Sequence, residues 1–84
     1  MLENHIGFRE INGILVILNP LTSEYFLFSG IERLILNAII LKFSKEEILK
    51  KILKTYSISF ETAKKDLDLF TLELLNKKIL RKVN

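Results

Sequence analysis

Cysteine is absent from this chain of 84 residues. Without cysteine the chain can form no disulfide, no thiolate metal site and no cysteine nucleophile, and this composition agrees with a cytoplasmic location. Histidine occurs once, as His5, so neither a histidine metal cluster nor a catalytic triad can be built around it. We therefore expect no catalytic residue, no metal and no cofactor, which makes a stand-alone enzyme the less favoured class.

Glycine and long apolar runs are also scarce. Three glycines are present, at Gly7, Gly13 and Gly30, and their spacing matches no phosphate-binding loop. The first ten residues lack the basic and apolar regions of a secretory signal. The most apolar window, residues 31–43, is interrupted by four polar or charged residues and is shorter than the roughly 20 residues that span a bilayer. We expect a cytoplasmic protein without a membrane partner.

The residues that are present indicate a small folded domain. Hydrophobic residues make up 49% of the chain and charged residues 27%, a composition typical of a globular protein. The length fits one domain over residues 1–84. The formal net charge is +3, with lysine and arginine crowded toward the C-terminus. Such a bias suits an acidic partner, peptide or nucleic acid, but most such runs are solvated helix faces.

The first third of the chain has the pattern of a three-stranded antiparallel sheet. Asn12-Gly13 separates two runs rich in β-branched residues, and this dipeptide favours a tight hairpin because both turn positions accept positive φ. The second run, "ILVIL", is followed by a polar loop that contains Pro20. A third strand, "EYFLF" at residues 24–28, then completes the predicted sheet.

Three helices are predicted after the sheet, so the fold class is α+β. Ser29 with Glu32 and Ser44 with Glu47 have the spacing of capping boxes, in which a serine and a glutamate three residues later satisfy each other's backbone N–H groups. Ser59 is the expected N-cap of the last helix.

The last predicted helix has two apolar faces. Ala63, Leu67, Phe70 and Leu74 form one stripe at helical spacing, whereas Leu69 and other apolar residues lie on the opposite side. The second face is either core or an exposed strip that binds a partner. The outward apolar residues are Leu69 and Leu72.

The runs "VILNPLTSEYFLFSGIERLIL", "FSKEEILKKILKTYSIS" and "AKKDLDLFTLELLNKKIL" resemble the PqqD-like family, the recognition elements for precursors of ribosomally synthesised, modified peptides. The resemblance is to stand-alone members such as the B1-type proteins of lasso peptide biosynthesis, and it implies a winged helix-turn-helix-like fold. The chain departs from the family pattern at Phe28, where a polar residue is usual, and at Lys78, where glycine is common. Leu69 and Leu72 replace residues that are often small.

The resemblance implies a noncatalytic protein that binds the leader of a precursor peptide and presents it to a modifying enzyme or leader peptidase. The leader would add a strand along the third strand and dock against the third helix, as in other cases of strand addition. Leu69 and Leu72 would hold apolar leader side chains, and Lys64 or Lys65 would meet acidic ones. The implied leader-binding residues are Glu24, Tyr25, Phe26, Leu27, Phe28, Lys64, Lys65, Asp68, Leu69 and Leu72.

Two other functions remain open from the residues alone. A winged helix can bind nucleic acid through its recognition helix, but here the outward positions of the last helix are leucines and acids as much as lysines. Salt-dependent retention on duplex DNA would favour that function. The apolar strip could instead meet a second copy of the chain, and a tight dimer without ligand would favour a homodimerisation module.

Overall fold

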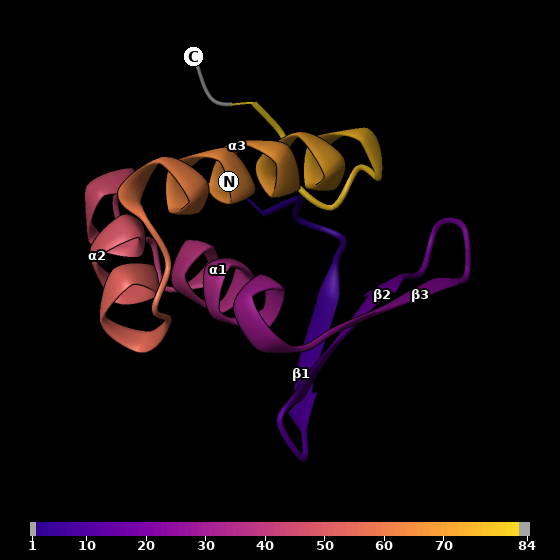
Figure 1. Ribbon diagram of the computed structural model, residues 1–84. Helices are drawn as coiled ribbons and strands as arrows, with labels where there is room; N and C mark the ends of the chain where they lie inside the picture. The colour runs from indigo at the N-terminus through magenta and orange to yellow at the C-terminus, as the bar shows by residue number, and fades with distance from the viewer. Residues whose placement is uncertain (1, 83–84) are drawn as a thin grey trace.

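The computed structural model describes residues 2–82, so residues 1, 83 and 84 of the predicted domain lie outside the described residues. Over residues 2–82 the chain forms an antiparallel sheet of three strands and then three helices, which confirms the predicted α+β class. Figure 1 shows α3 across the top, α1 beneath it, α2 at one end and the sheet on the other side. The elements are β1 (Gly7–Ile11), β2 (Ile14–Asn19), β3 (Glu24–Phe28), α1 (Gly30–Ile40), α2 (Lys45–Thr55) and α3 (Phe60–Asn76).

The sheet has the order β1-β2-β3, and the predicted hairpin forms at its first turn. Asn12 and Gly13 both have positive φ, 50° and 81°, as a two-residue hairpin turn requires. Ile11 pairs with Ile14 beside this turn. At the other end of β2, Asn19 is buried and its side-chain oxygen accepts a hydrogen bond from the Leu21 backbone N–H at 3.1 Å. That bond shapes the loop into β3.

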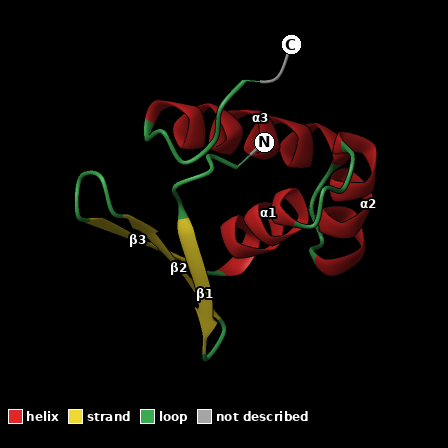
Figure 2. Ribbon diagram, turned by 180° about the vertical axis from the view of Figure 1, so that it is seen from behind, coloured by secondary structure: helices red, strands yellow, loops and turns green. Residues whose placement is uncertain are grey.

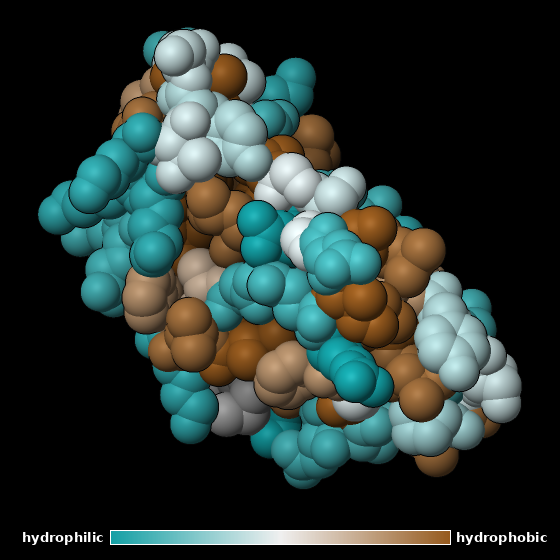
Figure 3. Space-filling view, turned by 90° about the horizontal axis from the view of Figure 1, so that it is seen from below, coloured by the Kyte–Doolittle hydropathy of each residue, from teal (hydrophilic) through white to brown (hydrophobic). Residues whose placement is uncertain are grey.

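The two faces of the sheet differ in burial. Leu15, Ile17 and Phe28 are buried on the face that packs against the helices, and the register places them on one side because residues opposite each other share a face. Tyr25 and Leu27 lie on the other face and are exposed. The turn between β1 and β2 is the lowest point in Figure 1. Figure 3 shows the molecule from below, where hydrophobic areas in brown are separated by hydrophilic residues in teal.

The helices bury the stripes that the sequence predicts. Ala63, Leu67, Phe70 and Leu74 of α3 are all buried, and they pack with buried residues of the sheet, α1 and α2 in one core. Burying a leucine-sized side chain contributes about 1.5 to 3 kcal/mol, so this shared core is the main reason that so short a chain folds.

Two of the three expected caps form. Ser44 Oγ accepts from the Glu47 N–H at 3.2 Å while Glu47 Oε1 accepts from the Ser44 N–H at 2.9 Å, a complete capping box. Ser59 Oγ accepts from the Thr62 N–H at 3.1 Å. The capping box predicted at Ser29 is wrong, because Ser29 makes no side-chain cap bond. Gly30 enters α1 with φ of 59°, and this left-handed turn out of β3 differs from the ordinary geometry of a capping box.

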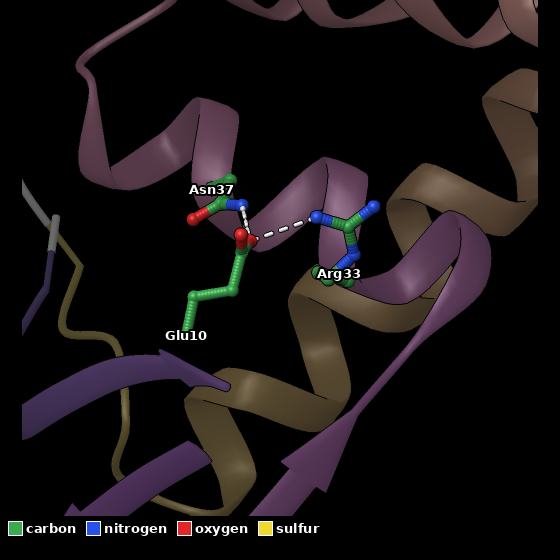
Figure 4. Close-up of polar contacts among 3 residues, drawn as sticks. All are labelled: Glu10, Arg33 and Asn37. Atoms are coloured by element: carbon green, nitrogen blue, oxygen red, sulfur yellow. Dashed lines mark hydrogen bonds and ion pairs between the residues drawn. The ribbon is translucent and has the colours of Figure 1, made fainter. Parts of the chain in front are cut away.

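A polar cluster joins β1 to α1 (Figure 4). Glu10 Oε1 accepts from Arg33 Nη1 at 2.8 Å and from Asn37 Nδ2 at 3.2 Å. The hydrogen bond from Arg33, followed by that from Asn37, lowers the pKa of Glu10 below its ordinary value of 4.5. Both hydrogen bonds are accepted by a charged carboxylate, and they join segments far apart in the sequence. They therefore help to orient the β1–β2 hairpin relative to α1.

The two ends of the described chain meet behind α3. Leu2 forms a bridge with Leu80, and the Glu3 N–H donates to the Ile79 carbonyl at 2.9 Å; the segment before β1 rises toward α3 in Figure 2. Lys78, at the position where glycine is common, adopts φ of 60° and ends α3 in the manner of a left-handed cap. Within residues 2–82, no helix has the length and apolar character to cross a membrane.

Candidate functional site: the edge of β3 and the groove beside α3

Strand β3 is paired on one side only. It forms a ladder with β2, and within residues 2–82 no strand pairs with its other edge. An unpaired edge presents backbone N–H and C=O groups that can template another strand, so proteins commonly protect it with charge, proline or a bulge. Here the strand reads "EYFLF", with Glu24 as its one charged residue. Charge at this edge is therefore confined to the start of the strand.

The side chains of β3 alternate between the two faces of the sheet. Phe26 and Phe28 lie toward α3: the Phe28 ring meets the Phe70 ring edge-on at 5.3 Å, and Lys77 Nζ lies 5.8 Å from the centre of the Phe26 ring. Tyr25 lies on the exposed face. Phe28, at the position where a polar residue is usual, is buried and joins the end of β3 to α3.

A groove lies between the start of α1 and one flank of α3, next to Ser29 at the end of β3, and we call it the β3–α3 groove; Figure 1 shows how these elements are arranged. Its volume is about 420 Å³. Leu69 stands on the wall formed by α3, and although apolar it is 56% exposed, so part of its surface is free to contact a ligand. The groove is lined by Ser29, Ile31, Glu32, Ile35, Asp66, Leu69, Phe70 and Glu73.

The charged residues of the β3–α3 groove are acids. Glu32, Asp66 and Glu73 line it, and no lysine or arginine does. Glu73 is paired with Lys77 at 3.1 Å, one turn further along α3. The lining therefore combines an apolar floor with a negative rim, and a peptide that carries a basic side chain beside an apolar one complements it.

Four of the five residues predicted on α3 share one hollow, and Leu72 lies outside it. Leu69 lines the β3–α3 groove, but Leu72, which is 54% exposed, lines neither this groove nor the other two described below. Lys64, Lys65, Asp68 and Leu69 together line a shallow hollow at the start of α3, with Phe60 and Glu61. Asp68 faces α2, where its carboxylate pairs with Lys45 Nζ at 2.8 Å.

The groove also contains residues that the sequence did not single out. Asp66 and Glu73 flank Leu69 at helical spacing, and Lys77 continues the same flank one turn later. The signal was present: positions 66, 69, 70, 73 and 77 follow the i, i+3, i+4 rule of one helix face. It could not be used because nothing in the sequence indicated which flank of α3 the open edge of β3 would face.

The lining of the groove is apolar and acidic. No group of three or more histidine, cysteine, aspartate or glutamate side chains within residues 2–82 is arranged to hold a metal ion. The β3–α3 groove holds serine and carboxylates but no histidine or lysine beside the serine that would activate it as a nucleophile. Its complementary features are an unpaired backbone edge, an apolar wall and acidic side chains.

Comparison with solved structures identifies proteins with the same fold. TbiB1 in complex with the TbiA(beta) leader peptide is 25% identical; the match covers 99% of this chain and 96% of that chain, with a TM-score of 0.92. Lasso peptide synthetase B1 complexed with the leader peptide is 16% identical; the match covers 98% of this chain and 96% of that one, with a TM-score of 0.90. The predicted resemblance to B1-type proteins is thus confirmed.

Comparison by sequence gives no further relative. No protein-family model matches the chain, and no curated protein matches it. The likeness is therefore carried by the three-dimensional arrangement over nearly the whole length of both partners rather than by many shared residues. At 25% and 16% identity, core positions can be conserved in character while the groove residues differ, so the groove has to be interpreted from its own side chains.

Proposed function

We propose that this protein binds the leader of a ribosomally synthesised precursor peptide in the β3–α3 groove. The observation that carries the proposal is the open edge of β3, whose end leads into a groove that Leu69 of α3, 56% exposed, lines together with Ser29. Two structures with the same fold, TbiB1 and lasso peptide synthetase B1, are complexes with leader peptides. A natural ligand for such a surface is an extended peptide, because it can pair along the strand and insert side chains beside the helix.

In this proposal the leader becomes the strand next to β3. The backbone of Tyr25, Phe26, Leu27 and Phe28 supplies hydrogen bonds that do not depend on leader sequence, while Glu24 marks the start of the pairing. Alternate leader residues then point toward α3, where an apolar side chain packs on Leu69. The opposite set of leader residues extends the exposed face of the sheet.

Charge selects among leaders. Asp66 and Glu32 favour a basic leader side chain in the groove. In the adjoining hollow Lys64 and Lys65 stand beside Glu61 and Asp68, and because Asp68 is paired with Lys45, the lysines there can meet an acidic leader side chain. We propose that the preferred leader carries both signs, separated along the strand. Asp68 acts indirectly, because its pairing with Lys45 anchors the start of α2 beside α3. Leu72, on the exposed crest of α3 outside the groove, makes weaker contacts with the leader.

The energetics allow a useful affinity. One leucine-sized leader anchor contributes about 1.5 to 3 kcal/mol, and each backbone hydrogen bond adds about 1 kcal/mol net. Ordering a disordered leader costs about 2 to 5 kcal/mol or more. With about four strand bonds and two anchors the balance is about −2 to −8 kcal/mol, and its favourable end corresponds to a micromolar complex.

The proposed role is noncatalytic. The protein holds the leader and presents the rest of the precursor to a modifying enzyme or leader peptidase, which supplies the chemistry. A winged helix that reads DNA would need a basic recognition surface, but α3 mixes Asp66, Asp68 and Glu73 with its lysines. We favour leader binding for this reason.

The test is a titration of isotope-labelled protein with the N-terminal segment of a candidate precursor peptide, followed by amide NMR. Strand addition predicts that the amides of Tyr25 to Phe28 and of Asp66 to Glu73 shift, and that some β3 amides become protected from exchange. If the peptide binds but β3 amides stay unprotected, strand addition is wrong. If duplex DNA shifts α3 in a salt-dependent way while the peptide shifts nothing, the protein is a nucleic-acid binder. A tight dimer that buries β3 would indicate the homodimerisation module.

A further inference from the structure

A larger groove lies on the flank of α3 that faces away from β3, and we call it the flank groove. Its volume is about 770 Å³, within the range of pockets that bind peptide side chains or small ligands. Ile48, Leu67 and Leu80 are buried at its base, while Phe43 and Ile40 are half-buried on its walls. It is formed by the segment before β1, the end of α1, the start of α2 and the chain after α3, elements that Figure 2 shows from behind.

The frame of the flank groove is built from backbone hydrogen bonds. At the end of α1, the Phe43 N–H donates to the Ala38 carbonyl and the Lys42 N–H to the Ile39 carbonyl, both at 2.9 Å. These two hydrogen bonds form a Schellman motif, with Lys42 in the left-handed conformation at φ of 65°. On the other side, Leu80 is held by its bridge to the N-terminal segment. The groove is therefore preformed.

The flank groove is apolar inside and basic at its rim. Lys42, Lys45 and Arg81 line it against one acid, Asp68. Asp68 pairs with Lys45 at 2.8 Å, and Arg81 lies 3.9 Å from Glu3. The net positive rim above an apolar base complements a ligand in which a carboxylate stands beside a large apolar side chain.

Helix α3 separates the two grooves. Leu67, Asp68 and Thr71 line the flank groove, whereas Asp66 and Leu69 line the β3–α3 groove. At 100° per residue these two sets lie on opposite flanks of the helix, so both grooves can be filled at the same time. A protein that presents a bound leader needs a second surface, outside the leader site, that holds the enzyme acting on the precursor.

We propose that the flank groove binds an acidic–apolar segment of the modifying enzyme or leader peptidase. This inference rests on the proposed function, since it assigns the partner that the leader is presented to. The segment would insert one or two large apolar side chains between Phe43 and Leu67 and place a carboxylate near Lys42. Leader binding on one flank and enzyme binding on the other would then be independent.

The test uses short synthetic peptides and two variants of the whole chain. The probe is acetyl-Glu-Leu-Phe-Glu-amide, with acetyl-Lys-Leu-Phe-Lys-amide as the charge control and acetyl-Glu-Ala-Ala-Glu-amide as the apolar control. Amide NMR should show saturable shifts for the probe at Ile40, Phe43 and Thr71, at concentrations up to about 5 mM because isolated short peptides bind weakly. Both controls should bind at least about fivefold more weakly, the lysine control because it reverses the charge at the rim.

Lys42→Glu and Leu69→Asp separate the two proposals. Lys42→Glu should weaken the probe about fivefold or more and leave leader binding unchanged, whereas Leu69→Asp should do the reverse. The proposal for the flank groove is overturned if the probe causes no saturable shifts, if shifts centre on β3, if the lysine control binds equally well or if Lys42→Glu has no effect on the probe. If the natural chain binds the probe but no leader, the proposed function is wrong and the flank groove still stands as a peptide site.

Discussion

Leu69 and Leu72 provide the most discriminating test of how a leader lies on this protein. They are the same residue type on the same helix, with 56% and 54% of their surface exposed, but only Leu69 lines the β3–α3 groove. Replacing each by alanine keeps the helix, since alanine has the highest helix propensity. Any difference between the two variants in leader affinity therefore reports the path of the peptide.

The expected effect at Leu69 follows from its exposed fraction. Full burial of a leucine contributes about 1.5 to 3 kcal/mol, and 56% of Leu69 remains to be covered by a leader. Covering that share contributes about 0.8 to 1.7 kcal/mol, so Leu69→Ala should weaken leader binding roughly 4- to 17-fold. Leu72→Ala should change affinity less than about twofold, because a residue outside the groove loses little contact.

Isothermal titration calorimetry with one leader peptide measures both variants against the natural chain, and circular dichroism checks that α3 is intact. Equal losses at Leu69 and Leu72 would mean that the leader crosses the crest of α3 rather than the β3–α3 groove. A loss at Leu72 alone would contradict the assignment of the groove. Unchanged affinity in both variants would show that α3 provides no apolar anchor.

Three further predictions concern the stability of the fold, and thermal or urea denaturation measures each of them. Ser44→Ala should destabilise the protein by about 1 kcal/mol because it removes a capping box, whereas Ser29→Ala should have little effect since Ser29 makes no side-chain cap; equal effects would contradict the caps as described. Gly13→Ala should cost about 1 to 2 kcal/mol from its φ of 81° alone, since no atom lies within 4 Å of an added Cβ, and no loss would mean that the turn relaxes freely. The pKa of Glu10 is lowered in the folded state, so ionised Glu10 stabilises the folded protein above pH 4.5, and this stabilisation is lost as the pH falls through the lower folded pKa. Glu10→Gln should remove this part of the loss of stability in acid. A curve of stability against pH that is the same for the variant and the natural chain would refute the prediction.

The order of the elements could be predicted from the sequence because local signals set it. Asn12-Gly13 requires positive φ at two successive positions, and a hairpin turn provides them. Ser44 with Glu47, and Ser59, carry the hydrogen-bonding groups that open a helix wherever the helix later packs. The buried stripe of α3 also followed from its period alone, since one face of an amphipathic helix must leave water.

Local signals were insufficient where the chain bends out of one element into another. The capping box at Ser29 was wrong because the direct turn from β3 into α1 at Gly30 takes the left-handed conformation, and serine three residues before glutamate does not reveal that geometry. The clamp of Glu10 by Arg33 and Asn37 was likewise hidden, because it joins residues far apart in the sequence.

The sequence by itself determined which faces are apolar, including the unburied Leu69 and Leu72, because amphipathic periodicity is a property of neighbouring residues. Only the tertiary structure decided what those faces meet. The packing of α3 placed Leu69 in a groove with the start of α1, left Leu72 outside that groove and directed Asp68 to Lys45. The same packing created an acidic groove on one flank of α3 and a basic one on the other, because the sign of a groove depends on side chains that several distant elements bring together.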